Sequence, residues 1–100
     1  LDAIRICKYG KRKNKEIALH VWGSPLSFII NLHFALAFKE VDFIEYPLVR
    51  LKIFKEILDN DIQIDSGRVR LNSKKNGIGF TLNKNYLKKF KFIEKSGFSI

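Results

Sequence analysis

The stretch from Ser24 to Phe38 restricts the possible folds of this chain more than any other part of the sequence. Ser24 can cap a helix and Pro25 suits its first turn, so the pair predicts where a helix begins. The residues that follow, PLSFIINLHFALAF, are apolar on almost every side of that helix. Each large apolar side chain left in water would forfeit about 1.5–3 kcal/mol of burial energy. We therefore expect protein to cover most of the helix circumference. Polar residues interrupt the run, and it is too short to cross a bilayer.

Short apolar runs flank this predicted helix on both sides. EIALHV at 16–21 precedes it, and VDFIEYP at 41–47 follows it. The first run is almost continuously apolar, which indicates a strand covered on both faces. Residues 2–13 predict a further helix, with Asn14 suited to the left-handed conformation that ends a helix. The order helix, strand, helix, strand is typical of a parallel βα array.

The pattern changes after Pro47. Residues 48–60 predict a short amphipathic helix, and residues 62–83 alternate apolar and polar side chains. Turn signals at Ser66-Gly67 and Asn76-Gly77 within that stretch predict antiparallel hairpins. Asn83 is placed to cap a last helix, KNYLKKF. We therefore divide the chain into 1–47, 48–92 and a tail at 93–100.

The positive charge of the chain is unevenly distributed. The formal net charge is +9, and basic residues gather at 5–15 and 84–95. Such a balance can attract nucleic acid, but no aromatic-basic RNA motif, zinc-finger spacing or helix-turn-helix accompanies it. We interpret the excess of basic residues as a solvated surface, and we therefore do not expect a nucleic-acid partner. Cys7 is the single cysteine and no signal-peptide pattern opens the chain, so we expect a cytoplasmic protein without a membrane partner.

Two titratable residues stand at the ends of the two predicted strands. His20 lies at the end of the first strand, and Glu45 lies near the end of the second. Ligands of parallel α/β sheets bind at the carboxyl ends of the strands, so both side chains are expected to face one rim. Trp22 is expected to pack at this rim, and Gly23 to allow a sharp turn into the helix. A purely structural hydrogen-bonding role for His20 stays open, and no metal site is predicted.

A series of motifs resembles the C-terminal end of the mandelate racemase and muconate lactonizing enzyme group of the enolase superfamily. The matching segments are HVWGSPLSFIINLHFALAF, DFIEYP and DSGRVRLNSKKNGIGFTLNKNYLKKF. Members of the group commonly show a His-x-Trp-Gly-Ser-like turn, a helix with a Leu-His pair and a Phe-x-Glu-Tyr strand. An Asp-Gly hairpin, a Gly-x-Gly strand and a short helix follow. The resemblance covers residues 3–90, and the series is specific although no single motif is.

The resemblance implies an α/β fold made of the last strands and helices of a (β/α)7β TIM-type barrel. Residues 1–47 would be this incomplete barrel, and residues 48–92 would be a C-terminal α+β segment of the capping domain. His20 matches the histidine that moves the proton α to a carboxylate. Glu45 matches the last-strand glutamate that hydrogen-bonds the substrate carboxylate. Leu19 stands where many members have proline.

The implied enzyme is a sugar-acid dehydratase or racemase, a lyase or isomerase that uses Mg²⁺. In this family the three acidic metal ligands, the lysine base and the aspartate partner of the histidine lie on earlier strands. The resemblance therefore implies that this chain alone is inactive and binds no cofactor.

The expected partners are the remaining barrel and capping domain, a sugar-acid substrate, and further copies or chains in a homo- or hetero-oligomer. A fragment, a decayed gene product and a separate subunit remain alternatives. The alternative function is a small non-catalytic basic α/β module that binds a partner such as RNA.

Overall fold

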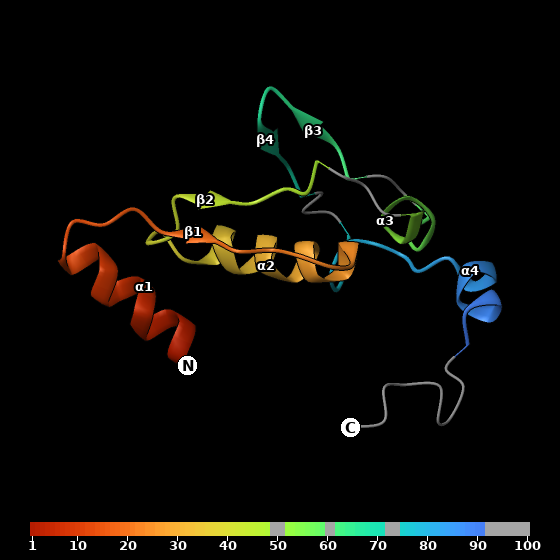
Figure 1. The fold of residues 1–100 in the computed structure, drawn as a ribbon, viewed down its shortest axis with the longest axis horizontal. Helices are drawn as coiled ribbons and strands as arrows, with labels where there is room; N and C mark the ends of the chain where they lie inside the picture. Colours follow the sequence, from red (N-terminus) through yellow and green to blue (C-terminus); the bar gives the residue numbers. More distant parts are fainter. Residues whose placement is uncertain (49–51, 60–61, 72–74, 92–100) are drawn as a thin grey trace. The chain divides into compact units, whose positions relative to one another are not determined.

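The computed structural model describes residues 1–48, 52–59, 62–71 and 75–91 (Figure 1). The chain divides into two compact units, Leu1–Leu51 and Lys52–Ile100. The tail predicted at 93–100 lies outside the described residues. The helix predicted over 48–60 lies partly outside them, at residues 49–51 and 60. Within the described residues, no helix has the length and apolar character needed to traverse a membrane.

The first unit follows the predicted order of elements. Helix α1 spans Asp2–Arg12, strand β1 Ala18–Leu19, helix α2 Pro25–Ala37 and strand β2 Phe43–Ile44 (Figure 1). The two strands are parallel, with Ala18 opposite Phe43 and Leu19 opposite Ile44. This pairing confirms the parallel βα arrangement predicted from the sequence.

The return from α1 to β1 depends on two residues that tolerate unusual packing or backbone angles. Asn14 has a φ of 54°, which confirms the left-handed position predicted at the end of this helix. A Cβ atom at Gly10 would lie 2.5 Å from Ile17 Cδ1. Lys15 N also donates a hydrogen bond to Gly10 O at 3.0 Å. Gly10 therefore lets the chain pass close over α1 on its way into β1.

The core of the first unit is built around one side of α2. Ser24 caps the helix as predicted, with its Oγ accepting a hydrogen bond from Ser27 N at 3.4 Å. Phe28 is 1% exposed, and its ring meets Tyr46 edge to face at 5.2 Å between centroids. Among residues 1–48 of this unit, the buried side chains are Cys7, Val21, Pro25, Phe28, Ile29 and Leu32.

The other side of α2 is not covered within these residues. Ile30 is 60% exposed and Leu36 is 62% exposed, so the burial predicted for most of the circumference is not reached in this chain. One face of the strand pair is open as well, because Ala18 and Phe43 are both exposed. The expectation that the first strand is covered on both faces is therefore wrong for the chain by itself.

The second unit contains a helix, a hairpin and a capped terminal helix. Helix α3 spans Lys52–Glu56, and strands β3 (Ile64–Asp65) and β4 (Arg68–Val69) pair antiparallel. Ser66 and Gly67 have φ angles of 49° and 73°, as a two-residue type I′ turn requires. The hairpin predicted at Ser66-Gly67 is therefore confirmed.

The hairpin predicted at Asn76-Gly77 has a different outcome. Gly77 makes a turn with a φ of 63°, but no strand ladder flanks it among the described residues. Leu82 instead forms an antiparallel bridge with Leu58. In the described part of this unit, the buried apolar side chains are Phe54, Ile57 and Leu58. Leu82 thus pairs with Leu58, whereas residues 72–74, in the arm of the predicted hairpin before the turn, lie outside the described residues.

The last helix, α4, spans Lys84–Lys89 and begins where the sequence predicts. The Asn83 side chain accepts hydrogen bonds from Asn85 N at 3.0 Å and Tyr86 N at 3.1 Å. Asn83 thus satisfies two of the amide groups that the first turn of a helix leaves without partners.

Candidate active site

The two predicted site residues lie beside each other at the carboxyl ends of the parallel strands. His20 directly follows β1 and Glu45 directly follows β2, one step beyond the pair Leu19–Ile44. His20 Nδ1 lies 2.6 Å from Glu45 Oε2. Glu45 N donates to Leu19 O at 3.0 Å, which continues the pairing of the strands past their ends. The parallel register therefore brings these two side chains together.

Side-chain alternation assigns this pair to the open face of the strands. Successive side chains of a strand point to opposite faces. Leu19 and Ile44 are half-buried, whereas Ala18 and Phe43 are exposed, and α2 packs against β2. His20 and Glu45 follow one residue later, on the same face as Ala18 and Phe43 by this alternation. That face is the one away from the helix.

A backbone amide also fixes the Glu45 carboxylate. Val21 N donates to Glu45 Oε2 at 3.2 Å, and Val21 is only 3% exposed. The hydrogen bond from His20, followed by the one from Val21 N, holds the pKa of the Glu45 carboxyl below its usual range. Glu45 is therefore ionised at neutral pH and accepts both hydrogen bonds.

The pair is open to solvent and to a ligand. The His20 side chain is 80% exposed and the Glu45 side chain is 52% exposed. No described residue hydrogen-bonds His20 Nε2. Nδ1 thus faces the carboxylate while Nε2 is available to an incoming group. A histidine arranged in this way can exchange a proton at Nε2.

The turn after His20 has the geometry expected for Gly23 but not for Trp22. Gly23 has a φ of 103°, and nothing lies within 4 Å of where its Cβ would be. The backbone angle, rather than crowding, is thus the reason for glycine at this position. The Trp22 side chain is 65% exposed, so the packing expected of it at the rim is not made within these residues.

A second carboxylate occupies the opposite end of the strand pair, and our reasoning from the sequence missed it. Asp42 Oδ1 lies 2.5 Å from Lys11 Nζ, and Asp42 Oδ2 accepts from Ile17 N at 2.7 Å. The Lys11 hydrogen bond, followed by the Ile17 N–H, lowers the pKa of the Asp42 carboxyl. The signal was visible in VDFIEYP, which has one acid before and one after its apolar centre.

The described residues do not form a ligand set for a metal ion. Among them, no three His, Cys, Asp or Glu side chains are grouped closely enough to hold one. Asp42 is bound to Lys11 and Ile17 N, at the end of the strands away from the rim. Glu45 is the rim carboxylate, and it is bound to His20. These residues therefore do not fit the Mg²⁺ ion that members of the enolase superfamily generally use.

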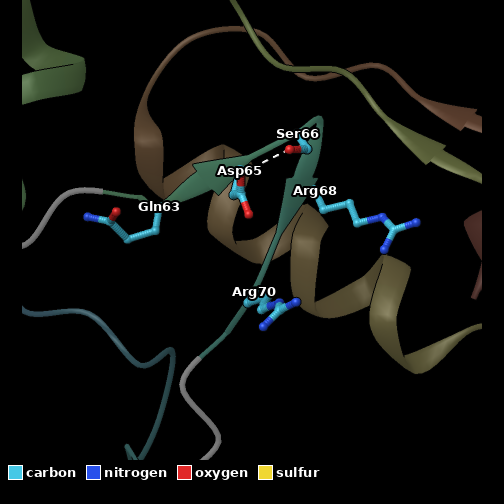
Figure 2. A pocket seen from close by; sticks show the side chains of 5 residues that line it. All are labelled: Gln63, Asp65, Ser66, Arg68 and Arg70. Carbon is cyan, nitrogen blue, oxygen red and sulfur yellow. Dashed lines mark hydrogen bonds between the residues drawn. The ribbon is translucent and has the colours of Figure 1, made fainter.

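Basic side chains line several hollows on the described surface, among them one on the β3–β4 hairpin and one beside α1. Figure 2 shows one on the β3–β4 hairpin, about 370 Å³ in volume and lined by Gln63, Asp65, Ser66, Arg68 and Arg70. Ser66 Oγ donates to Asp65 Oδ1 at 3.0 Å, and Arg68 extends away from Asp65 (Figure 2). Another, on the α1 side of the first unit, measures about 480 Å³ and is lined by Lys8, Lys11, Arg12 and Glu40. Neither hollow is lined by His20 or Glu45.

Comparison with known proteins identified one family. The family model described as enolase C-terminal domain-like matches residues 1–86. No curated protein and no solved structure matched the chain. The family match confirms the resemblance to the C-terminal portion of the mandelate racemase and muconate lactonizing enzyme group, and it implies an α/β fold of the TIM-barrel type.

Proposed function

Since the chain belongs to the enolase C-terminal domain-like family, we propose that it supplies part of the active-site rim of an enzyme that moves the proton α to a carboxylate. The substrate would be a sugar acid and the reaction a dehydration or a racemisation. The observation that carries the proposal is the contact between His20 Nδ1 and Glu45 Oε2 at the carboxyl ends of two parallel strands. The enzyme is expected to be cytoplasmic.

The open face of the strand pair supports a barrel completed by other strands. In a TIM-type barrel the helices pack outside the strands, and alternate strand residues fill the interior. Leu19 and Ile44 would then face the helix layer, and the exposed Ala18 and Phe43 would face the interior. His20 and Glu45 would stand above Ala18 and Phe43 at the top of the barrel. The exposed apolar side of α2 would pack against neighbouring helices.

The proton transfer uses groups that these residues provide. The neutral His20 ring takes the α-proton at Nε2, and the electron pair of the broken C–H bond passes into the substrate carboxylate to give an enediolate. Racemisation is completed when an acid on the opposite face of the enediolate, which the earlier strands would supply, delivers a proton to carbon, and Nε2 gives its proton to solvent. For dehydration, the imidazolium gives its Nε2 proton to the β-hydroxyl, which leaves as water as the electron pair of the enediolate forms the carbon–carbon double bond of an enol. The Glu45 carboxylate stabilises the imidazolium formed in between.

The test is exchange of the α-proton with deuterated water, measured on a panel of sugar acids with the protein completed by the earlier barrel strands. His20→Asn removes the proton acceptor, so exchange should fall by about 10²–10⁴-fold. His33→Asn is the matched control, because His33 lies within α2, and its exchange should match the wild type. Wild-type exchange in His20→Asn would refute the proposed role of His20.

The alternative function, a basic module that binds a partner such as RNA, has a specific observation in its favour. Arg68 and Arg70 lie two residues apart at β4, so their side chains leave the same face of the hairpin. Titration of single-stranded RNA at several salt concentrations tests this alternative. Each phosphate contact should contribute roughly −0.7 to the slope of log affinity against log salt. The double variant Arg68→Gln, Arg70→Gln should make the slope shallower. An unchanged slope would show that the hairpin is not the RNA-binding surface.

A further inference from the structure

One face of the β3–β4 hairpin gathers polar side chains of both charges. Asp65 pairs with Arg68 across the antiparallel strands. Directly opposed residues share a face, and the alternation along each strand places Gln63 and Arg70 on that same face. These four residues line the hollow of about 370 Å³ in Figure 2. A hollow of this volume can hold a small organic molecule.

The two arginines of the hollow are free to bind an anion. In the part of the chain that the structure describes, neither guanidinium forms an ion pair or a hydrogen bond. Arg68 extends away from Asp65, its partner across the strands (Figure 2). Residues two apart in a strand have Cα atoms about 6.5 Å from each other, so the long side chains of Arg68 and Arg70 can reach one ligand. A guanidinium is always charged, and its paired N–H groups match the two oxygens of a carboxylate.

A hydrogen-bond acceptor beside the arginines restricts the kind of anion. Asp65 Oδ1 accepts a hydrogen bond from Ser66 Oγ at 3.0 Å, and no described residue donates one to Asp65 Oδ2. Oδ2 can therefore accept a hydrogen bond from a hydroxyl group of a ligand. The Gln63 side-chain amide can both donate and accept such bonds. Because the Asp65 carboxylate offsets one of the two guanidinium charges, the hollow favours a ligand with a single negative charge over a phosphate dianion.

We propose that this hollow binds a small hydroxycarboxylate, an organic acid with one carboxylate and neighbouring hydroxyl groups. Arg68 and Arg70 bind the carboxylate, and Asp65 and Gln63 bind the hydroxyl groups. The site shares no residue with the strand-end pair of the first unit, and it does not rest on the proposed function.

The hairpin turn sets the arrangement of these side chains before a ligand binds. Ser66 and Gly67 have φ angles of 49° and 73°, and a type I′ turn needs positive φ at both central residues. A two-residue turn of this type fixes the register of its strands, and the register decides which side chains share the polar face. Less conformational ordering is therefore required when the ligand binds.

Titration of the full chain with gluconate, followed by amide NMR shifts, tests the proposal. Gluconate carries one carboxylate and a hydroxyl group on each remaining carbon. The shifts should be confined to residues 63–70 and should saturate at millimolar concentrations, because exposed ion pairs are weak. Sorbitol lacks the carboxylate and acetate lacks the hydroxyl groups, so each should bind about tenfold more weakly or less. Inorganic phosphate, in a mildly alkaline buffer that makes it a dianion, should also bind more weakly than gluconate.

Substitutions test the arginines and the acid separately. Arg68→Gln and Arg70→Gln should each weaken gluconate binding by about tenfold, the effect of one hydrogen bond between charged groups. Asp65→Asn removes the negative charge and weakens the acceptor, so the preference for gluconate over phosphate should fall by about tenfold. Arg5→Gln is the matched control, because it removes the same charge from an exposed side chain of α1, and it should leave the gluconate affinity unchanged.

Several results would overturn the proposal. It is wrong if gluconate causes no saturable shifts, or if Arg68→Gln and Arg70→Gln bind gluconate as the wild type does. It is also wrong if inorganic phosphate binds residues 63–70 more tightly than gluconate, a result that would favour the RNA alternative. Should the glutamine variants lose their folded amide spectrum, Arg68→Lys keeps the charge without the planar fork. Wild-type gluconate affinity in that variant would equally exclude the site.

Discussion

Neighbouring isoleucines on α2 should differ sharply in what they contribute to stability. Ile29 is 0% exposed and Ile30 is 60% exposed. Ile29→Ala deletes fully buried methyl and methylene groups, so we expect a loss of about 2–5 kcal/mol from the free energy of unfolding. Ile30→Ala removes side-chain area that is already mostly in water. Its cost should be about 1 kcal/mol or less, reduced further by the better helix propensity of alanine.

The assay is urea unfolding of the 100-residue chain followed by far-ultraviolet circular dichroism. Both substitutions make the same chemical change in one helix, so the difference between them isolates burial. If the free energy of unfolding of the wild-type chain is smaller than the loss caused by Ile29→Ala, this variant should be unfolded in buffer without urea. Ile30→Ala should still show an unfolding transition. Equal losses for the two variants would refute the one-sided packing of α2.

The same pair of variants tests the proposed barrel. In a protein that supplies the neighbouring helices, Ile30 should be covered, and Ile30→Ala should then cost about as much as a core substitution, roughly 2–5 kcal/mol. If Ile30→Ala remains nearly neutral in the longer protein, the exposed side of α2 is a true surface, and the prediction that protein covers most of this helix is wrong.

Three further substitutions test local features. Asp42→Asn should reduce stability at neutral pH. The Lys11 and Ile17 N–H contacts lower the pKa of the Asp42 carboxyl, so the stabilisation is present above about pH 4 and disappears as the pH falls through the lowered value. Urea unfolding across this pH range should show that acid lowers the free energy of unfolding less in the variant than in the wild type. An equal decrease in both proteins would contradict the Asp42 contacts. Ser24→Ala should cost about 0.5–2 kcal/mol through loss of the α2 cap, and an unchanged unfolding midpoint would show that the cap contributes nothing. Gly67→Ala should strain a φ of 73° by roughly 1–2 kcal/mol. Amide hydrogen exchange in the hairpin should rise in this variant but much less in Gly67→Asn.

The elements that depend on local chemistry were predictable from the sequence. Ser24 with Pro25 marked the start of α2, Asn83 marked the start of α4, and Ser66-Gly67 marked the hairpin turn. Each works through contacts within a few residues or through backbone angles that few residue types adopt. The placement of His20 beside Glu45 was predictable too, because parallel strands end at one edge.

The features that were missed depend on what the rest of the chain offers as a partner. Apolar content predicted burial of α2 on most sides, but the described residues cover only the side that carries Phe28 and Ile29. Leu82, in the alternating stretch after Asn76-Gly77, pairs with Leu58, a partner that the alternation did not indicate. Periodicity indicates which face of an element is apolar. It does not indicate which segment covers that face.

The carboxylates at the two ends of β2 explain how such a short strand pair sets the geometry of the rim. Asp42 binds Ile17 N and the Lys11 ammonium before the strands, and Glu45 binds Val21 N and His20 after them. Each acid thus joins one backbone amide and one basic side chain of the preceding segment. Two such attachments, on either side of the paired residues, disfavour a slip of the register in either direction, since a slip would separate both acids from their amides. The orientation of His20 therefore depends on contacts between residues 17–21 and 42–45. A completed barrel would add the substrate site around this pair, whereas the position of the proposed base is already determined by residues of this chain.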